Sequence, residues 1–287
     1  MRIGTILPTA ESDGPGRIPT WAEILDFTRH AEAVGIDSAW AADHLYGNEP
    51  SKPAEGIHEA WALMCGLAAA TGRIRLGHLV NCVSFRSPGL LAKMAVTADE
   101  ISGGRFTLGL GAGWHDPEYK AFGYPIDHRV SRFEEALEII VRLLRSETVT
   151  FDGRYHSVSE AQLLPAPDRK IPLLIAGNKP RMVELTARHA DAWNTAWFRK
   201  VDERLRTRLD NMDAALRAAG RDRSQMEVTV GVVVEDAEEP AAANRVADLI
   251  RGTRELGVDE LIVLPLPITK RALERIAEGR ARPASAR

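Results

Sequence analysis

The sequence predicts an α/β fold, a (β/α)8 TIM barrel with loop insertions at its C-terminal face. One junction recurs along the chain: a helical stretch, a glycine, then a short run of β-forming residues, as at Gly35 before SAWAA and Gly257 before ELIVL. A glycine after a helix adopts the left-handed conformation that ends the helix and lets the chain turn into a strand. Such strand–helix units follow one another throughout, which favours parallel strands in a closed barrel. The 287 residues also suit one barrel of about 250 residues with longer loops.

Eight apolar segments rich in β-forming residues are expected to be the strands, and each is followed by a helical pattern. They lie near residues 2–7, 38–43, 74–81, 105–110, 171–176, 190–195, 226–234 and 259–264. Their nearly continuous apolar character is typical of parallel strands that are buried on both faces.

Capping-box spacing marks the start of two expected helices. Thr20 and Glu23 stand three residues apart before one apolar stripe, and Ser131 and Glu134 repeat that spacing before another. In a capping box each of the two side chains bonds to the backbone N–H of the other residue. The expected buried stripes are Ile24, Phe27, Ala31 and Val34 for the first helix, and Phe133, Leu137, Ile140 and Leu144 for the second.

Two segments do not follow the simple alternation. Residues 111–128 are expected to form a long loop after the fourth strand. Residues 148–170 hold an expected hairpin, with Asp152-Gly153 at its turn, and then a proline-bearing loop. Long excursions on one face of a barrel are often functional. Both are interpreted as insertions within a single domain that spans residues 1–287.

Composition and charge argue against several classes of protein. The net charge is −3 and no basic run stands out, so neither nucleic acid nor an anionic membrane is expected as a partner. No apolar stretch approaches the roughly 20 residues that span a bilayer, and the first residues do not resemble a secretory signal. Cys65 and Cys82 have neither CxxC spacing nor histidines nearby, which argues against a disulfide framework or a zinc site. A reducing, cytoplasmic location is therefore expected.

Reactive side chains of a TIM barrel gather at the C-terminal ends of its strands. The candidate segments at these ends are Asp43-His44 after the second strand, Leu79 to Ser84 after the third, Gly109 to Trp114 after the fourth, Ala176 to Arg181 after the fifth, and Trp193 to Thr195 after the sixth. Because parallel strands end at the same edge, these segments are expected to lie together.

The pair Asp43-His44 is open to several interpretations. It could transfer a proton, anchor a heterocycle by hydrogen bonds, supply half of a metal site, or simply cap the next helix. The three glycines of GLGAGW favour close approach of the backbone to a flat ligand, although a tight turn would need them as well. They do not complete a dinucleotide-binding motif, because Trp114 stands where GxGxxG needs a small residue.

The segment AGNKPR precedes an amphipathic helix. Backbone N–H groups at the start of that helix, with Lys179 and Arg181 beside them, would suit a phosphate. The alternative is an ordinary Asn-Lys-Pro turn. GxSxG, HExxH and Walker sequences are absent from the sequence, so the common hydrolase and NTPase signatures are missing.

Taken in order, these segments resemble the luciferase-like monooxygenase superfamily, and most of all its coenzyme F420-dependent branch. The resemblance is carried by GIDSAWAADHL, by IRLGHLVNCVSFRSPGLLAKMAVTADEISGGRFTLGLGAGWHDPEYKAFGYP, by RFEEALEII and FDGRYH, and by PLLIAGNKPRMVELTARHADAWNTA. It covers about two-thirds of the chain, and the C-terminal part adds only a compatible barrel pattern.

The resemblance implies a cofactor that lies across the C-terminal mouth of the barrel, and no resident metal. The implied roles are these: Asp43 and His44 face the redox ring; Leu79, Val80 and Cys82 support its back face; Gly111, Gly113 and Trp114 flank it; Ala176, Gly177, Asn178 and Lys179 bind the side-chain phosphate; Thr195 and Trp114 line the substrate pocket. It also implies a cis peptide bond between Leu79 and Val80.

The leading hypothesis is an F420-dependent oxidoreductase that transfers a hydride between the deazaflavin and a small organic substrate, with His44 as the proton-transfer residue. The alternative is an FMN-dependent two-component monooxygenase supplied by a separate reductase. A metal-dependent hydrolase using Asp43, His44 and His78 is disfavoured, because no carboxylate–histidine set recurs at several strand ends. A non-catalytic flavin-binding protein is a further hypothesis. Trp114 stands where several F420-dependent dehydrogenases carry a glutamate, which favours a flatter, less polar substrate. The resemblance further implies a homodimer.

Overall fold

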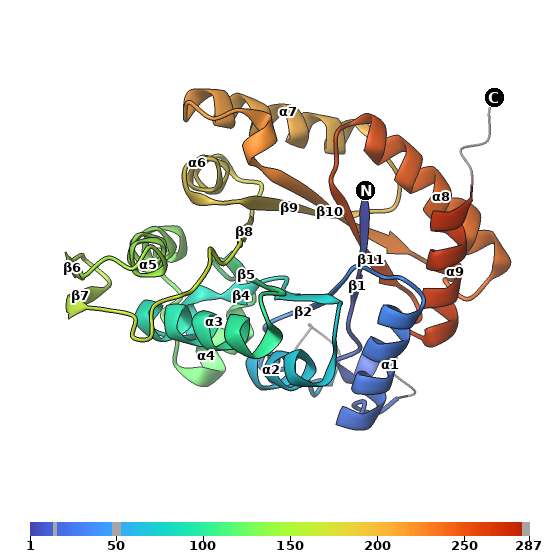
Figure 1. Ribbon diagram of the computed structural model, residues 1–287, viewed down its shortest axis with the longest axis horizontal. Coiled ribbons are helices and arrows are strands. Elements are labelled where there is room, and N and C mark those ends of the chain that lie inside the picture. Colours follow the sequence, from blue (N-terminus) through green and yellow to red (C-terminus); the bar gives the residue numbers. More distant parts are fainter. Residues whose placement is uncertain (14–15, 48–52, 283–287) are drawn as a thin grey trace.

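The computed structural model describes residues 1–13, 16–47 and 53–282. Its central feature is a barrel of parallel strands (Figure 1). The barrel strands are β1 (Arg2–Ile6), β2 (Ser38–Ala41), β3 (Arg75–His78), β5 (Phe106–Gly111), β8 (Leu173–Ala176), β9 (Ala192–Phe198), β10 (Glu227–Val234) and β11 (Glu260–Pro265). They are paired in the order β3-β2-β1-β11-β10-β9-β8-β5, and the additional pairing of β3 with β5 closes the ring. All eight expected strands are confirmed, and so is the (β/α)8 barrel.

Helices cover the outside of this barrel (Figure 1). They are α1 (Trp21–Ala33), α2 (Ala60–Ala70), α3 (Pro88–Ser102), α4 (Asp116–Phe122), α5 (Arg129–Leu144), α6 (Pro180–His189), α7 (Glu203–Ala218), α8 (Pro240–Glu255) and α9 (Lys270–Ala281). Short 3-10 turns occur at Glu11–Asp13, Val83–Phe85 and Arg223–Gln225, and the two-residue strand β4 (Asn81–Cys82) pairs with the end of β5. Among the described residues, no helix has the length and apolar character needed to cross a membrane.

One of the two expected capping boxes is present and the other is wrong. Glu23 N lies 3.3 Å from Thr20 Oγ1, and Thr20 N lies 2.8 Å from the Glu23 carboxylate, so α1 begins as predicted. Helix α5, however, already starts at Arg129, because His128 takes the left-handed conformation (φ 52°) at the N-cap. Ser131 and Glu134 are therefore inside the helix, not at its cap.

The structure corrects the prediction for the first insertion and confirms the hairpin predicted for the second. The segment 111–128 is not continuous loop, since residues 116–122 form α4. The second insertion does contain the expected hairpin, with β6 (Val149–Asp152) antiparallel to β7 (Ser157–Ala161), beside α5 (Figure 1). Glu135 of α5 fixes its turn, because its carboxylate accepts hydrogen bonds of 2.8–2.9 Å from three consecutive backbone N–H groups of residues 154–156.

The interior of the barrel is divided into an apolar layer and a charged one. The apolar layer consists of Trp40, Leu174, Ala192 and Ile262, with Ile6, Leu79 and Val80 packed on it. Leu79 and Val80 are half-buried and follow the end of β3, so they form the upper, C-terminal surface of this layer. Any molecule at the mouth of the barrel would rest on them.

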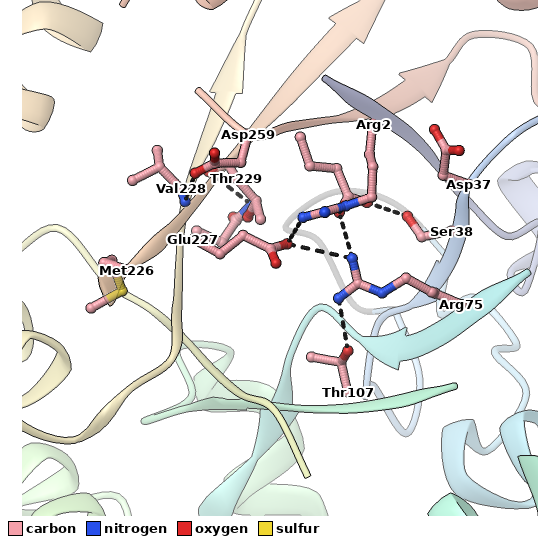
Figure 2. Close-up of polar contacts among 12 residues, drawn as sticks. Arg2, Asp37, Ser38, Arg75, Thr107, Met226, Glu227, Val228, Thr229 and Asp259 are labelled. Atoms are coloured by element: carbon pink, nitrogen blue, oxygen red, sulfur yellow. Dashed lines mark hydrogen bonds and ion pairs between the residues drawn. The ribbon is translucent and has the colours of Figure 1, made fainter. Parts of the chain in front are cut away.

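The N-terminal end of the barrel is filled by charged side chains (Figure 2). Glu260 is fully buried, with Oε2 3.2 Å from Arg2 Nε and 3.4 Å from Arg75 Nη1. Its other oxygen accepts a hydrogen bond from Ser38, whose hydroxyl oxygen accepts one of 2.7 Å from Trp40 Nε1. Arg2, Ser38, Arg75 and Glu260 are the first residues of their strands and therefore lie opposite the candidate segments. We call this set the basal network.

Candidate functional site

A cavity of about 120 Å³ opens at the C-terminal mouth of the barrel. It is lined by Ala42, Asp43, His44, Leu79, Val80, Asn81, Cys82, Phe85, Gly113, Trp114, His115, Glu118 and Tyr119. Larger grooves of about 550 Å³ lie on the outer surface, for example between α8 and α9, but none of the strand-end segments reaches that groove. The mouth cavity is therefore the site where the predicted residues of the second, third and fourth strand ends meet.

His44 is held by a glutamate that the sequence analysis did not single out. His44 Nδ1 lies 2.9 Å from Glu118 Oε2, and His115 Nδ1 lies 3.2 Å from the same oxygen. The second oxygen, Oε1, accepts a 2.5 Å hydrogen bond from the backbone N–H of Leu45. Because a carboxylate only accepts hydrogen bonds, His44 carries its proton on Nδ1 when neutral, a tautomer assigned from this network. Its Nε2 is then left as a base.

The charge state of Glu118 supports this assignment. Burial opposes the charged form, but the hydrogen bond and positive charge of His44 and the backbone N–H groups of Leu45 and Tyr46 hold the pKa of Glu118 below its ordinary value. The side chain is only 2% exposed, whereas that of His44 is 24% exposed. An ionised, enclosed carboxylate thus orients a partly accessible imidazole.

Asp43 does not face the cavity with a free carboxylate. Its oxygens accept hydrogen bonds of 2.6 and 3.0 Å from Arg86, and a third of 3.0 Å from Cys82 N. Arg86 also contacts Glu59, the N-cap residue of α2, at 2.7 Å. Asp43 therefore fastens the end of β2 to the segment after β3, and it shapes the mouth rather than offering a reactive group.

The predicted supporting residues lie at the mouth as expected. The Leu79–Val80 peptide bond is cis, which confirms that prediction. Cys82 is buried, with Sγ 3.1 Å from Tyr119 Oη. Burial raises the pKa of Cys82 to about 11, so at neutral pH it is a thiol and not a nucleophile.

The glycines of the GLGAGW segment are required by the protein itself. A Cβ at Gly109 would lie 1.9 Å from the carbonyl oxygen of His78, and one at Gly111 would lie 2.6 Å from Val80 Cγ2. Gly113 has φ +77°, and a Cβ there would lie 2.0 Å from Tyr119 Oη. Close packing of strand ends thus accounts for all three glycines without a ligand, the alternative that the sequence left open.

Trp114 lies at the rim of the cavity and is 70% exposed. Its ring meets that of His44 edge-on at 5.6 Å and lies 5.1 Å from that of His115. Such exposure contradicts a role confined to packing under the loop. A large apolar face beside His44 is available to a ligand.

The segment expected to bind a phosphate is positioned by buried hydrogen bonds. Ala176 and Gly177 are half-buried and Asn178 and Lys179 are exposed, directly before α6. Thr195 Oγ1 donates to Asn178 Oδ1 at 2.8 Å and accepts from Arg208 at 2.9 Å. Arg181, the second expected cation, is bonded to Ser131 and Glu134 of α5, which leaves Lys179 as the cation of this turn.

Thr195 is buried, with 1% exposure, and does not line the mouth cavity. Its hydroxyl is used in the chain from Arg208 to Asn178. That Thr195 lies near the substrate stays a prediction; in this structure its hydroxyl positions Asn178.

The ligand set of the metal-dependent hydrolase is not assembled. His78 is fully buried between the rings of Trp61 and Phe106, with centroids 4.5 and 5.7 Å away, and burial lowers its pKa to about 3. Among the described residues, His44, His115 and Glu118 instead present metal-ligand atoms within 4.8 Å of one another. His115 and Glu118 stand three residues apart in WHDPEY. This spacing was not interpreted as helical, because residues 111–128 were expected to form a loop.

The chain is similar in sequence to known oxidoreductases. The chain is 30% identical over 241 residues to the F420-dependent glucose-6-phosphate dehydrogenase of Kineococcus radiotolerans, covering 82% of this chain and 68% of that one. It is 30% identical over 257 residues to the pyrimidine monooxygenase RutA of Methylorubrum extorquens, covering 85% and 70%. The chain thus spans about two-thirds of the length of these curated relatives.

A solved structure shares the fold over nearly the whole chain. An F420-dependent secondary alcohol dehydrogenase in complex with an F420–acetone adduct superimposes with a TM-score of 0.81 at 21% identity, covering 96% of this chain and 97% of that one. Residues 1–284 match the model of the family described as luciferase-like monooxygenase. The chain belongs to the luciferase-like monooxygenase family.

Proposed function

We propose that this protein is an F420-dependent oxidoreductase that transfers a hydride between the deazaflavin and a small organic substrate at the mouth of the barrel. The observation that carries the proposal is the 2.9 Å contact between His44 Nδ1 and Glu118 Oε2, which leaves Nε2 of a partly exposed imidazole as a base at the strand ends. The similarity to the Kineococcus dehydrogenase supports the choice of cofactor.

The residues at the mouth fit a flat cofactor with a phosphate-bearing side chain. Leu79 and Val80 offer a half-buried apolar surface on the barrel interior, and Trp114 offers an exposed aromatic wall. Ala176, Gly177, Asn178 and Lys179 would hold the phosphate, with Lys179 supplying the positive charge. When bound, F420 supplies the hydride chemistry.

The protein itself would bind and orient the cofactor and the substrate, and it would exchange one proton with the substrate. Glu118 keeps the proton of His44 on Nδ1, so that Nε2 accepts a proton from the substrate or, once protonated, returns one. Asp43 and Arg86 keep the segment after β3 in place, which holds Cys82 and the apolar surface before it. Trp114 shields His44 from one side.

A second candidate is a monooxygenase that uses FMN supplied by a separate reductase. The observation that favours it is the similarity to pyrimidine monooxygenase RutA over 85% of the chain. The apolar surface of Leu79 and Val80 and the exposed ring of Trp114 would suit an isoalloxazine ring equally well.

A fluorescence titration separates the two. We expect oxidised F420 to bind more tightly than FMN, and Lys179→Ala to weaken F420 binding by about tenfold through loss of a charged hydrogen bond to the phosphate. Lys200→Ala removes an exposed lysine elsewhere and serves as the matched control. Tight binding of FMN with no response to F420 would replace the first proposal with the second.

A further inference from the structure

Two histidines and one glutamate present metal-ligand atoms to one another at the rim of the mouth cavity. We propose that His44, His115 and Glu118 form a binding site for one divalent transition-metal ion of the zinc class, and that occupancy of this site inhibits the enzyme. The sequence predicts no resident metal, and the proposed site is regulatory and takes no part in the proposed reaction.

The donor set is the first argument. Two imidazole nitrogens and one carboxylate oxygen are a set that Zn²⁺ takes in catalytic sites, with bonds of about 2.0–2.2 Å in tetrahedral geometry. Such bonds place neighbouring ligand atoms roughly 3.3 Å apart. Here Oε2 of Glu118 lies 2.9 Å from Nδ1 of His44 and 3.2 Å from Nδ1 of His115, and the three residues each offer one ligand atom within 4.8 Å of the others. An ion can therefore enter with small side-chain movements.

The surroundings of these ligands are the second argument. Metal-ligating carboxylates are commonly held by further hydrogen bonds that orient them. Glu118 Oε1 accepts such a bond from Leu45 N, and Oε2, which contacts both imidazoles, is the oxygen that would bind the ion in place of those contacts. The His115 side chain is only 10% exposed and its ring packs against those of Trp114 and Tyr46. The three ligands are thus ordered before an ion arrives.

The third argument is the space beside the cluster. All three ligands line the mouth cavity of about 120 Å³, so a fourth position faces solvent and a water molecule can complete the tetrahedron. A metal bond at His44 Nδ1 replaces the hydrogen bond to Glu118. If His44 transfers the proton, as the proposed function requires, an occupied site removes it from that task.

Binding is tested on the full chain after treatment with EDTA and buffer exchange, without cofactor or substrate. We expect calorimetry to show one Zn²⁺ per chain, and Co²⁺ to give the visible absorption of a tetrahedral nitrogen and oxygen site. Glu118→Gln and His115→Asn should each weaken binding by at least about tenfold. His128→Asn, which removes a half-exposed histidine outside the cluster and keeps a residue that tolerates its left-handed backbone, should bind as the wild type does.

Several results would overturn the site. They are the absence of binding to a folded wild-type chain, undiminished binding by a folded Glu118→Gln or His115→Asn variant, and an intense near-ultraviolet thiolate band with Co²⁺, which would assign the ion to a cysteine. Thermal melting of each variant establishes that it is folded. One Zn²⁺ bound through these ligands without loss of turnover would keep the site but remove inhibition and the role of His44. A failed cofactor titration, in contrast, leaves metal binding untouched.

Discussion

Both carboxylate oxygens of Asp43 accept hydrogen bonds from Arg86, at 2.6 Å from Nη1 and 3.0 Å from Nη2. The carboxylate is 1% exposed and the guanidinium 11% exposed, so this ion pair is almost entirely enclosed. It joins the end of β2 to the segment that follows β3, and it therefore governs the shape of the mouth.

We expect Arg86→Met to destabilise the protein by about 3–5 kcal/mol, because it leaves the buried Asp43 carboxylate without its partner. Urea unfolding measures the change. The double variant Asp43→Asn/Arg86→Met should recover part of the loss, since the amide carries no charge to compensate. An Arg86→Met protein that unfolds at the wild-type urea concentration would show that the pair does not hold this region.

The second prediction concerns Glu118→Gln and the tautomer of His44. The amide lacks the charge that fixes the proton on Nδ1, so we expect the neutral imidazole to populate both tautomers. Nitrogen-15 NMR of labelled histidines reads this directly, without substrate. Turnover should fall by about 10²–10⁴-fold if His44 is the proton-transfer residue. Glu255→Gln, a change at the exposed C-terminal end of α8, should leave both readouts unchanged.

The third prediction concerns the pH dependence of stability. Burial lowers the pKa of His78 from 6.5 to about 3, so between these values the unfolded chain binds a proton that the folded chain does not. Above pH 6.5 the titration of His78 does not change the free energy of unfolding. As the pH drops from 6.5 towards 3, the free energy of unfolding falls by about 1.4 kcal/mol per pH unit.

His78→Leu should flatten this part of the profile, as measured by urea unfolding at a series of pH values. Trp61→Phe disturbs the same packing but keeps the imidazole, and should retain the wild-type slope. Equal slopes for wild type and His78→Leu would mean that His78 does not titrate on unfolding.

The fourth prediction concerns Trp114→Ala. Because this side chain is 70% exposed, its removal should change the melting temperature little. We expect ligand binding at the mouth to weaken by roughly 1–3 kcal/mol, the value of a lost aromatic contact. Trp114→Phe should bind the ligand with an affinity between those of the wild type and of Trp114→Ala. A large fall in melting temperature with unchanged binding would identify the residue as a packing element.

The strands were predictable because burial on both faces leaves a clear apolar signature, and helix-ending glycines mark the way into several of them. The position of Asp43, His44, Leu79, Val80 and Trp114 at one mouth follows from that pattern alone. Which group each side chain contacts does not follow, because contacts across the mouth join residues up to 74 positions apart.

The sequence-based predictions failed at positions where the local backbone conformation differs from the one that the residue spacing indicated. Glu118 and His115 were assigned to a loop, and only α4 brings the glutamate under His44. The false capping box at Ser131 has the right spacing, but with His128 at the N-cap the helix starts three residues earlier than that spacing implies. A three-residue spacing cannot reveal a left-handed residue upstream.

The basal network determines from which end ligands can enter the barrel. Glu260 and its arginines fill one end of the barrel and Trp40 packs above them, so in the part of the chain that the structure describes the barrel interior is a packed core and not a pore. Cofactor and substrate must then use the same entrance. A cofactor seated on Leu79 and Val80 occupies the deeper position, so it must arrive before the substrate and leave after the product. Under the proposed function we therefore expect compulsorily ordered binding, in which excess substrate in the empty mouth competes with the cofactor.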